Sequence, residues 1–184
     1  YAETEAAFAS VRDALVNQIA GKDVSFITLT LCGKGEPLKE LIERLYKHFR
    51  ALRLHPVWAE NVKGGAAILE IKHSAKAKRW HPHLHIIADA KFIHQSELSA
   101  AWRSISKDSF IVDIRRVKNP AVAGSYVCKY ASKPLDTSFT GQAALLDEAI
   151  MALKGTRLCM CFGDWYGTPL QNAEDEELAD DIID

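Results

Sequence analysis

The 184-residue sequence has no apolar run that approaches the ~20 residues needed to cross a bilayer. Its first residues, 1–15, also lack the profile of a secretory signal peptide. Both absences predict a soluble protein that has no membrane partner, and the use of cysteine adds the expectation of a cytoplasmic setting. With 48% apolar residues and an ordinary charged fraction, the chain can form one sizeable core, and we expect a single main domain rather than disorder.

Cysteine is scarce, and its spacing excludes a disulfide framework. The four cysteines, Cys32, Cys128, Cys159 and Cys161, form no CxxC pair, and a domain of this size needs no disulfide to fold. We therefore expect reduced thiols, with Cys159 and Cys161 on one face of a strand as small apolar groups.

The net charge of −1 conceals an uneven distribution. Residues 174–184 hold seven of the 24 acidic residues and no basic one, so residues 1–173 carry 23 basic against 17 acidic residues, an excess of about six. We interpret 174–184 as an acidic tail or linker that follows a domain over 1–173. The positive charge of that domain permits a polyanionic partner without requiring one.

Hydrophobic periodicity predicts alternating helices and strands. Helices are expected over residues 3–19, 37–52, 95–105, 120–133 and 144–154, and strands over 24–31, 57–62, 66–73, 83–90, 110–117 and 157–163. Lys63-Gly64-Gly65 is interpreted as a hairpin turn, and Pro82 suggests that the histidine strand starts just after His81. The pattern predicts an α+β fold in which helices pack on a mostly antiparallel sheet.

The segment "RWHPHLHIIADA" places histidines at alternate positions, His81, His83 and His85. Side chains alternate across a strand, so His83 and His85 share a face while Leu84 points to the other. Two imidazoles on one face of an apolar strand favour metal binding over a structural or substrate-contacting role. Glu70, on the preceding strand, is the best third ligand, with His81 as the alternative. This donor set suits Mn²⁺ or Mg²⁺, and Zn²⁺ remains open.

A second cluster lies in "SYVCKYASKP". On a helix, Tyr126, Lys129, Tyr130 and Lys133 fall at i, i+3, i+4 and i+7, which places two phenols and two ammonium groups on one stripe. The lysines indicate that this stripe faces solvent or phosphate rather than a core. A metal, a phenol and a lysine together are suited to nucleophilic attack on phosphorus.

These segments resemble the three motifs of the HUH endonucleases, in particular the two-tyrosine initiators of rolling-circle replication. "FITLTL" resembles the first motif, "WHPHLHII" the second and "YVCKYASK" the third, in the same order along residues 24–163. The resemblance implies a five-stranded antiparallel sheet with the histidines on a central strand. It also implies a site-specific endonuclease and strand transferase that nicks single-stranded or hairpin origin DNA, with a host helicase and polymerase as partners.

Carried over onto this chain, the resemblance makes Tyr126 and Tyr130 the nucleophiles of a covalent 5′-phosphotyrosine intermediate. It assigns phosphate positioning or leaving-group assistance to Lys129 and Lys133. One branch of single-tyrosine plasmid initiators has a glutamate where this chain has Tyr126, four residues before the tyrosine, so alternating tyrosines fit better and Tyr130 is the safer nucleophile.

The remaining candidates and the rival functions stay open. Arg115, Arg116 and Lys118 form a small basic cluster that either follows the DNA backbone or is a solvated strand end. The threonines of "FITLTL" are assigned no chemistry. The rival functions are a two-tyrosine transposase, a non-catalytic nucleic-acid-binding module, and a metallohydrolase that activates water.

Overall fold

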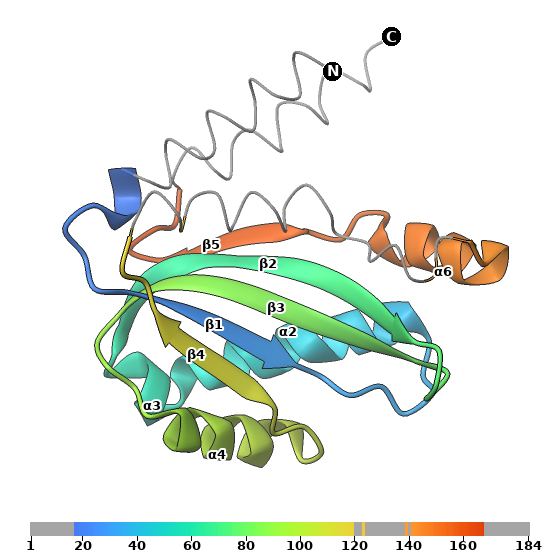
Figure 1. Ribbon diagram of the computed structural model, residues 1–184, viewed down its shortest axis with the longest axis horizontal. Helices are drawn as coiled ribbons and strands as arrows, with labels where there is room; N and C mark the ends of the chain where they lie inside the picture. Colours follow the sequence, from blue (N-terminus) through green and yellow to red (C-terminus); the bar gives the residue numbers. More distant parts are fainter. Residues whose placement is uncertain (1–16, 120–122, 124–138, 140, 168–184) are drawn as a thin grey trace, which may run out of the picture.

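A five-stranded antiparallel sheet organises the protein, as the sequence predicts. The structure is a computed structural model that describes residues 17–119, 123, 139 and 141–167. The strands lie in the order β4-β1-β3-β2-β5, and every neighbouring pair is antiparallel, so β3 is the central strand (Figure 1). The predicted α+β class is confirmed, and the histidine segment lies at the middle of the sheet.

The first strand and the helix after it form where the sequence pattern predicts. β1 (Val24–Thr30) is rich in β-branched residues, and α2 (Leu38–Leu54) begins directly after Pro37, whose fixed φ suits a helix start. The predicted apolar stripe of α2 is fully buried: Leu38, Leu41, Ile42, Leu45 and Phe49. The apolar face of α2 therefore packs against one face of the sheet.

The predicted hairpin at Lys63-Gly64-Gly65 is wrong. Residues Pro56–Ala59 form the short helix α3, and the two glycines lie inside β2 (Val62–Ser74), next to a bulge between Val62 and Gly64. They mark close backbone contacts rather than a turn, because a Cβ on Gly65 would lie 2.2 Å from the Ile87 carbonyl oxygen. A Gly-Gly pair is typical both of a hairpin turn and of a strand with close backbone contacts. Only the pairing of the neighbouring strands distinguishes the two.

The predicted start of the histidine strand is also wrong. β3 spans Arg79–Ala90, so Pro82 lies within it, opposite Ile71. The carbonyl and nitrogen of one strand residue face the same neighbour, and the Pro82 carbonyl accepts a hydrogen bond from Leu31. The pairing of β3 with β1 ends at Thr30 and His83. Pro82 lies just past that end, so its missing N–H interrupts no hydrogen bond of the β1–β3 register. The strand therefore continues through Pro82 to the turn.

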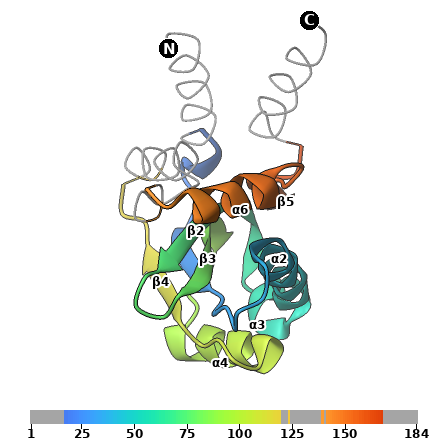
Figure 2. The ribbon, with the colours of Figure 1, turned by 90° about the vertical axis from the view of Figure 1, so that its right-hand side faces the viewer.

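The remaining elements include the two edge strands, β4 beside β1 and β5 beside β2, together with helices α4 and α6. α4 (Gln95–Ser106), β4 (Val112–Arg116), α6 (Ala143–Leu153) and β5 (Cys159–Gly163) agree with the predicted segments to within two residues at every boundary. Helices α2, α3 and α4 lie together on one side of the sheet (Figure 2). None of the described helices has both the length and the apolar character needed to cross a membrane.

Two separate apolar clusters occupy the two faces of the sheet. The larger one lies between the sheet and the helices, and it includes Leu29, Leu84, Ile86 and Trp102. The smaller one lies on the opposite face and is formed by Val24, Ile68, Ile87, Cys161 and Trp165, with Ala123. We call these sides the helix-covered face and the histidine face, because His83 and His85 alternate with Leu84 and Ile86 and share the second side.

Most of the predicted first helix and the acidic segment 174–184 lie outside the described residues, as does most of the predicted helix over 120–133.

Candidate metal centre on the histidine face

The strand register brings three of the predicted site residues onto neighbouring positions. His83 lies opposite Glu70 on β2, and His85 lies one pair further along β3 on the same face. On the other side of β3, Thr30 is paired with His83 and Thr28 with His85. Two imidazoles, one carboxylate and two hydroxyls therefore occupy adjacent positions on three strands.

Glu70 and His85 are joined directly. The Nε2 atom of His85 lies 2.7 Å from the Oε2 atom of Glu70, and each side chain is only 11% exposed. The Lys72 ammonium lies 3.3 Å from the same carboxylate oxygen. Burial opposes ionisation of Glu70, but the hydrogen bond from His85 and the charges of His85 and Lys72 outweigh it, so the pKa of Glu70 lies below its ordinary value.

His83 is held as a neutral imidazole. Burial, together with the nearby charge of His85, lowers the pKa of His83 to about 4. Its ring stacks beside that of His85 with the centroids 6.1 Å apart and the planes at 27°. A neutral imidazole at pH 7 has a lone pair available, which is the form that binds metals.

Two threonines fix the ring nitrogens. The Oγ1 atom of Thr30 lies 3.0 Å from Nδ1 of His83, and that of Thr28 lies 3.3 Å from Nδ1 of His85. When Nδ1–H donates to the hydroxyl oxygen, the lone pair of the imidazole is placed on Nε2. This holds for His83. In His85 the Nε2–H group donates to Glu70, so the neutral ring accepts at Nδ1 from the Thr28 hydroxyl, and both nitrogens of this ring are engaged.

Two imidazoles and a carboxylate are donor types that suit a divalent metal. In their present positions, however, no three His, Cys, Asp or Glu side chains of the described residues form a group that could hold a metal ion. His85 Nε2 and Glu70 Oε2 share one hydrogen, and loss of that hydrogen would give both atoms a lone pair for a cation. His81 lies one pair nearer the turn, opposite Lys72, and burial together with the charges of Arg79 and His73 lowers its pKa.

The basic cluster of β4 already has acidic partners. Arg115 Nε lies 2.8 Å from Asp113 Oδ2, and Arg116 forms an ion pair with Asp23. All four of these side chains are at least 46% exposed, and Lys118 is also exposed. This strand end therefore has the character of a solvated surface on which both arginines are paired with acidic groups.

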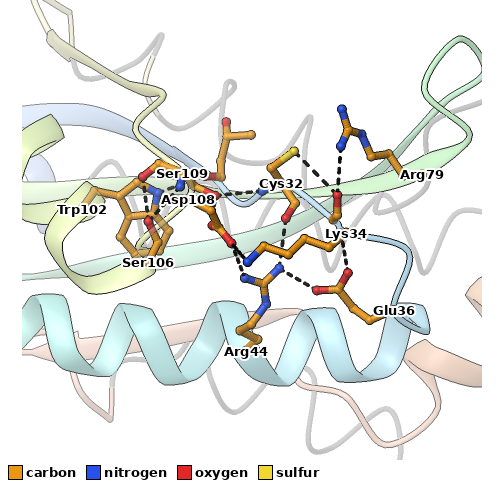
Figure 3. Close-up of polar contacts among 11 residues, drawn as sticks. Cys32, Lys34, Glu36, Arg44, Arg79, Trp102, Ser106, Asp108 and Ser109 are labelled. Atoms are coloured by element: carbon orange, nitrogen blue, oxygen red, sulfur yellow. Dashed lines mark hydrogen bonds and ion pairs between the residues drawn. The ribbon is translucent and has the colours of Figure 1, made fainter.

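A polar network behind β1 supports Thr30 from the helix-covered face. Arg44 of α2 donates to the Cys32 carbonyl and forms ion pairs with Glu36 and Asp108, at 2.6 and 3.1 Å (Figure 3). Asp108 in turn accepts from Ser109 and is paired with Lys34.

Trp102 completes this support, because its indole Nε1 donates to the Thr30 carbonyl over 2.9 Å. The network joins the segment after β1 to α2 and to the loop after α4, and it thereby fixes the end of β1 that carries Thr30.

The tyrosine motif lies outside the described residues, so the placement of Tyr126, Lys129, Tyr130 and Lys133 stays a prediction. The nearest described residue before this motif is Ala123. Ala123 is fully buried and belongs to the apolar cluster of the histidine face.

Sequence reasoning missed the roles of Thr28, Thr30 and Lys72. The signal was present, because threonines and histidines both alternate in their segments and Lys72 follows Glu70 at the same parity. The register between β1 and β3 was missing, and without it alternate threonines are explained equally well by strand propensity.

Comparison with known proteins gives a consistent result. The model of the family described as "Replication protein" matches residues 2–184. A protein named "Protein rep" from a Bacillus species is 34% identical over 106 residues, which are 52% of this chain and 34% of that protein. "Protein rep" from Bacillus amyloliquefaciens is 35% identical over 103 residues, covering 50% and 30%.

A third relative, "Protein rep" from Streptococcus pneumoniae, is 28% identical over 144 residues, covering 68% of this chain and 44% of the relative. The chain thus spans less than half the length of these relatives. No solved structure matches it.

Proposed function

The chain belongs to the Replication protein family, and from this premise and the geometry of the histidine face we propose that it initiates rolling-circle DNA replication by nicking one strand of origin DNA. The substrate would be single-stranded or hairpin DNA, and a host helicase and polymerase would act on the nicked product. The same domain would rejoin strands at the end of a round.

The observation that carries this proposal is the pairing of His83 with Glu70 and Thr30 on the central strand. Packing alone does not account for two histidines and a glutamate side by side, because a largely buried carboxylate beside an imidazole costs free energy that an apolar pair would not. Such groups are typical of a site that binds a cation or performs acid–base chemistry.

The proposed reaction is a transesterification at phosphorus. The phenol oxygen of Tyr130 or Tyr126 forms a bond to phosphorus, and the bond from phosphorus to the 3′ oxygen breaks. The phenol proton leaves the tyrosine, and the 3′ oxygen takes up a proton and departs as a hydroxyl. The 5′ phosphate stays on the tyrosine, so the number of phosphoester bonds is unchanged and no water is consumed.

His83, His85 and Glu70 would hold Mn²⁺ or Mg²⁺, with His81 as the alternative to Glu70. The ion would polarise a non-bridging phosphate oxygen and offset the charge that develops during attack. Lys129 and Lys133 would add positive charge beside the same phosphate. Thr28 and Thr30 orient the two imidazoles, and the buried surroundings strengthen these electrostatic interactions.

Chain connectivity supports Tyr126 as a residue of this face. Ala123 contributes to the cluster that contains Ile87, and Ile87 lies two residues from His85 on the same side of β3, about 7 Å along the strand. Tyr126 follows Ala123 by three residues, which span at most about 11 Å. The length of chain between the two residues therefore allows the phenol to reach the histidine face.

The direct test is the formation of a covalent protein–DNA adduct. The chain is incubated with single-stranded origin oligonucleotides and Mn²⁺, separated on a denaturing gel, and mapped by mass spectrometry. Single Tyr126→Phe and Tyr130→Phe proteins should each retain some adduct, because residues four apart on a helix lie about 5–6 Å apart at Cβ and either hydroxyl could reach one phosphate. The double variant should form none.

A matched control is Tyr166→Phe, which removes an exposed phenol of the described part of the chain and should leave the yield unchanged. Cleavage without an adduct would instead indicate a metallohydrolase, and binding without cleavage would indicate a non-catalytic module. In a Mn²⁺ titration, Glu70→Ala should weaken binding more than His81→Ala, and the reverse order would make His81 the third ligand.

A further inference from the structure

The hairpin formed by β2 and β3 extends beyond its neighbouring strands. The paired register with β1 ends at His83, and the register with β5 ends at Ile68. From there β2 and β3 continue as a hairpin, residues 71–82, at one end of the sheet (Figure 1). The segment after β1 runs beside its base, where Leu31 and Gly33 donate to the Pro82 and Trp80 carbonyls. We call residues 71–82 the β2–β3 arm.

The composition of the arm is one-sided. Residues 71–88 contain no acidic residue, whereas residues 72–81 alone contain four basic side chains and two histidines: Lys72, His73, Lys76, Lys78, Arg79 and His81. Lys76, Lys78 and Arg79 are exposed, and within the described part of the chain no ion pair joins them to an acid. This differs from Arg115 and Arg116, which both have a carboxylate partner.

The positive charge continues directly from the candidate metal centre. Glu70 and His83 form one pair on the histidine face, and Lys72 and His81 form the next pair on that face toward the turn. Ser74 and Arg79 follow at the same parity, and Lys76 and Lys78 lie in the turn itself. A strand that lies across the histidines can thus be followed by basic groups to the tip.

The arm is ordered at its base and at its turn. Trp80 is 5% exposed, and its ring packs edge-on against His73 and Phe139, with centroids 4.9 and 5.0 Å away. Arg79 reaches the Gly33 carbonyl, and the Ser74 hydroxyl accepts from the Ala77 amide over 3.1 Å. A rigid support reduces the entropy lost when its side chains bind a ligand.

We propose that the β2–β3 arm binds the phosphate backbone of the single-stranded DNA that flanks the scissile phosphate. The inference rests on the proposed nicking function for the identity of its ligand. Phosphate contacts of this kind fix the register of a strand without reading its sequence, so the arm positions the substrate over the histidines. Its lysines act by counterion release, and binding through them weakens as salt increases.

The test removes two exposed charges that do not contact the proposed metal ligands His83, His85 and Glu70. The variant Lys76→Gln/Lys78→Gln is compared with Lys39→Gln/Lys47→Gln, which removes two exposed lysines of α2 on the helix-covered face. The two proteins have the same net charge. Dissociation constants for a fluorescent single-stranded oligonucleotide are measured from about 50 to 300 mM salt in the absence of divalent metal.

The arm variant should bind about tenfold more weakly at low salt. The slope of log K against log salt should fall by about 1.4, since each lost contact to a single strand contributes about 0.7. The α2 control should stay within about twofold of the unmodified protein. Equal losses in both variants, or none in either, would overturn the proposal, and a loss confined to duplex DNA would overturn the single-strand assignment.

Adduct formation by the unmodified protein, measured with Mn²⁺ and the same oligonucleotide, separates this inference from the nicking function. An adduct together with equal binding by both variants rejects the arm and retains the function. Selective weakening of the arm variant without any adduct retains the arm as a DNA-binding surface and rejects the function.

Discussion

Alternate side chains of β3 lie in two different environments. Leu84 and Ile86 are at most 1% exposed and pack beneath α2 and α4, whereas His83 and His85 face a carboxylate and two hydroxyls on the opposite side. The same backbone positions both sets. Because strand side chains alternate, the strand separates the residues that stabilise the fold from those that supply chemistry, at a spacing of one residue.

The largest expected effects are a loss of stability from changes on the helix-covered face and a loss of activity from changes on the histidine face. Leu84→Ala should lower the free energy of unfolding by about 2–5 kcal/mol, because it leaves a cavity in the main apolar cluster. His85→Gln keeps a donor for Glu70 and should cost less than about 1.5 kcal/mol, yet it should abolish adduct formation. Urea denaturation and the adduct assay measure the two quantities. Normal adduct yield from His85→Gln would remove His85 from the site.

A smaller effect concerns pH, measured in chelator so that no metal contributes. His83 has a folded-state pKa of about 4, below the ~6.5 of an unfolded histidine. Its contribution to stability is therefore complete above pH 6.5 and is lost as the pH falls toward 4. The loss has a slope of at most about 1.4 kcal/mol per pH unit and a total of up to about 3 kcal/mol.

Urea denaturation of His83→Gln should show that the dependence between pH 6.5 and 4 is flatter by this amount. His94→Gln, at an exposed histidine before α4, should retain the dependence of the unmodified protein. Parallel curves for His83→Gln and the unmodified protein would show that His83 is not held neutral.

The fold was largely predictable because its signals are local. The stripe of α2 and the strand composition of β1 depend on residues near one another in sequence, and both were located correctly. The errors arose where a long-range contact decides. Gly65 is required by the approach of Ile87, and Pro82 is tolerated because the β1 register ends beside it. Neither contact can be read from the residues that flank those positions.

The candidate site was predictable to a similar limit. Alternation placed His83 and His85 on one face, and the preceding strand supplied Glu70, because hairpin neighbours pair predictably. The threonines are 53 and 57 residues from their histidines, and β1 becomes a neighbour of β3 only through the topology of the whole sheet. Sequence parity therefore selected the proposed ligands and left their supporting hydroxyls unassigned.

The smallest expected effect tests those hydroxyls. Thr30→Val replaces the hydroxyl with a methyl group of similar size, keeps the strand propensity, and removes the hydrogen bond to Nδ1 of His83. We expect Mn²⁺ affinity to fall about tenfold, since partners of metal-binding imidazoles typically contribute 10–100-fold. Nitrogen NMR of the metal-free protein should show more of the tautomer with hydrogen on Nε2, and Thr30→Ser should restore both properties.

Thr28→Val should have a weaker effect than Thr30→Val. Its hydroxyl lies 3.3 rather than 3.0 Å from the ring nitrogen, and Glu70 already holds the other nitrogen of His85. His83 depends on Thr30 more strongly, because within the described part of the chain the hydroxyl of that threonine is the hydrogen-bond partner of its side chain. Equal losses of metal affinity in the two valine variants, or no recovery in Thr30→Ser, would show that the hydroxyls contribute packing rather than orientation of the rings.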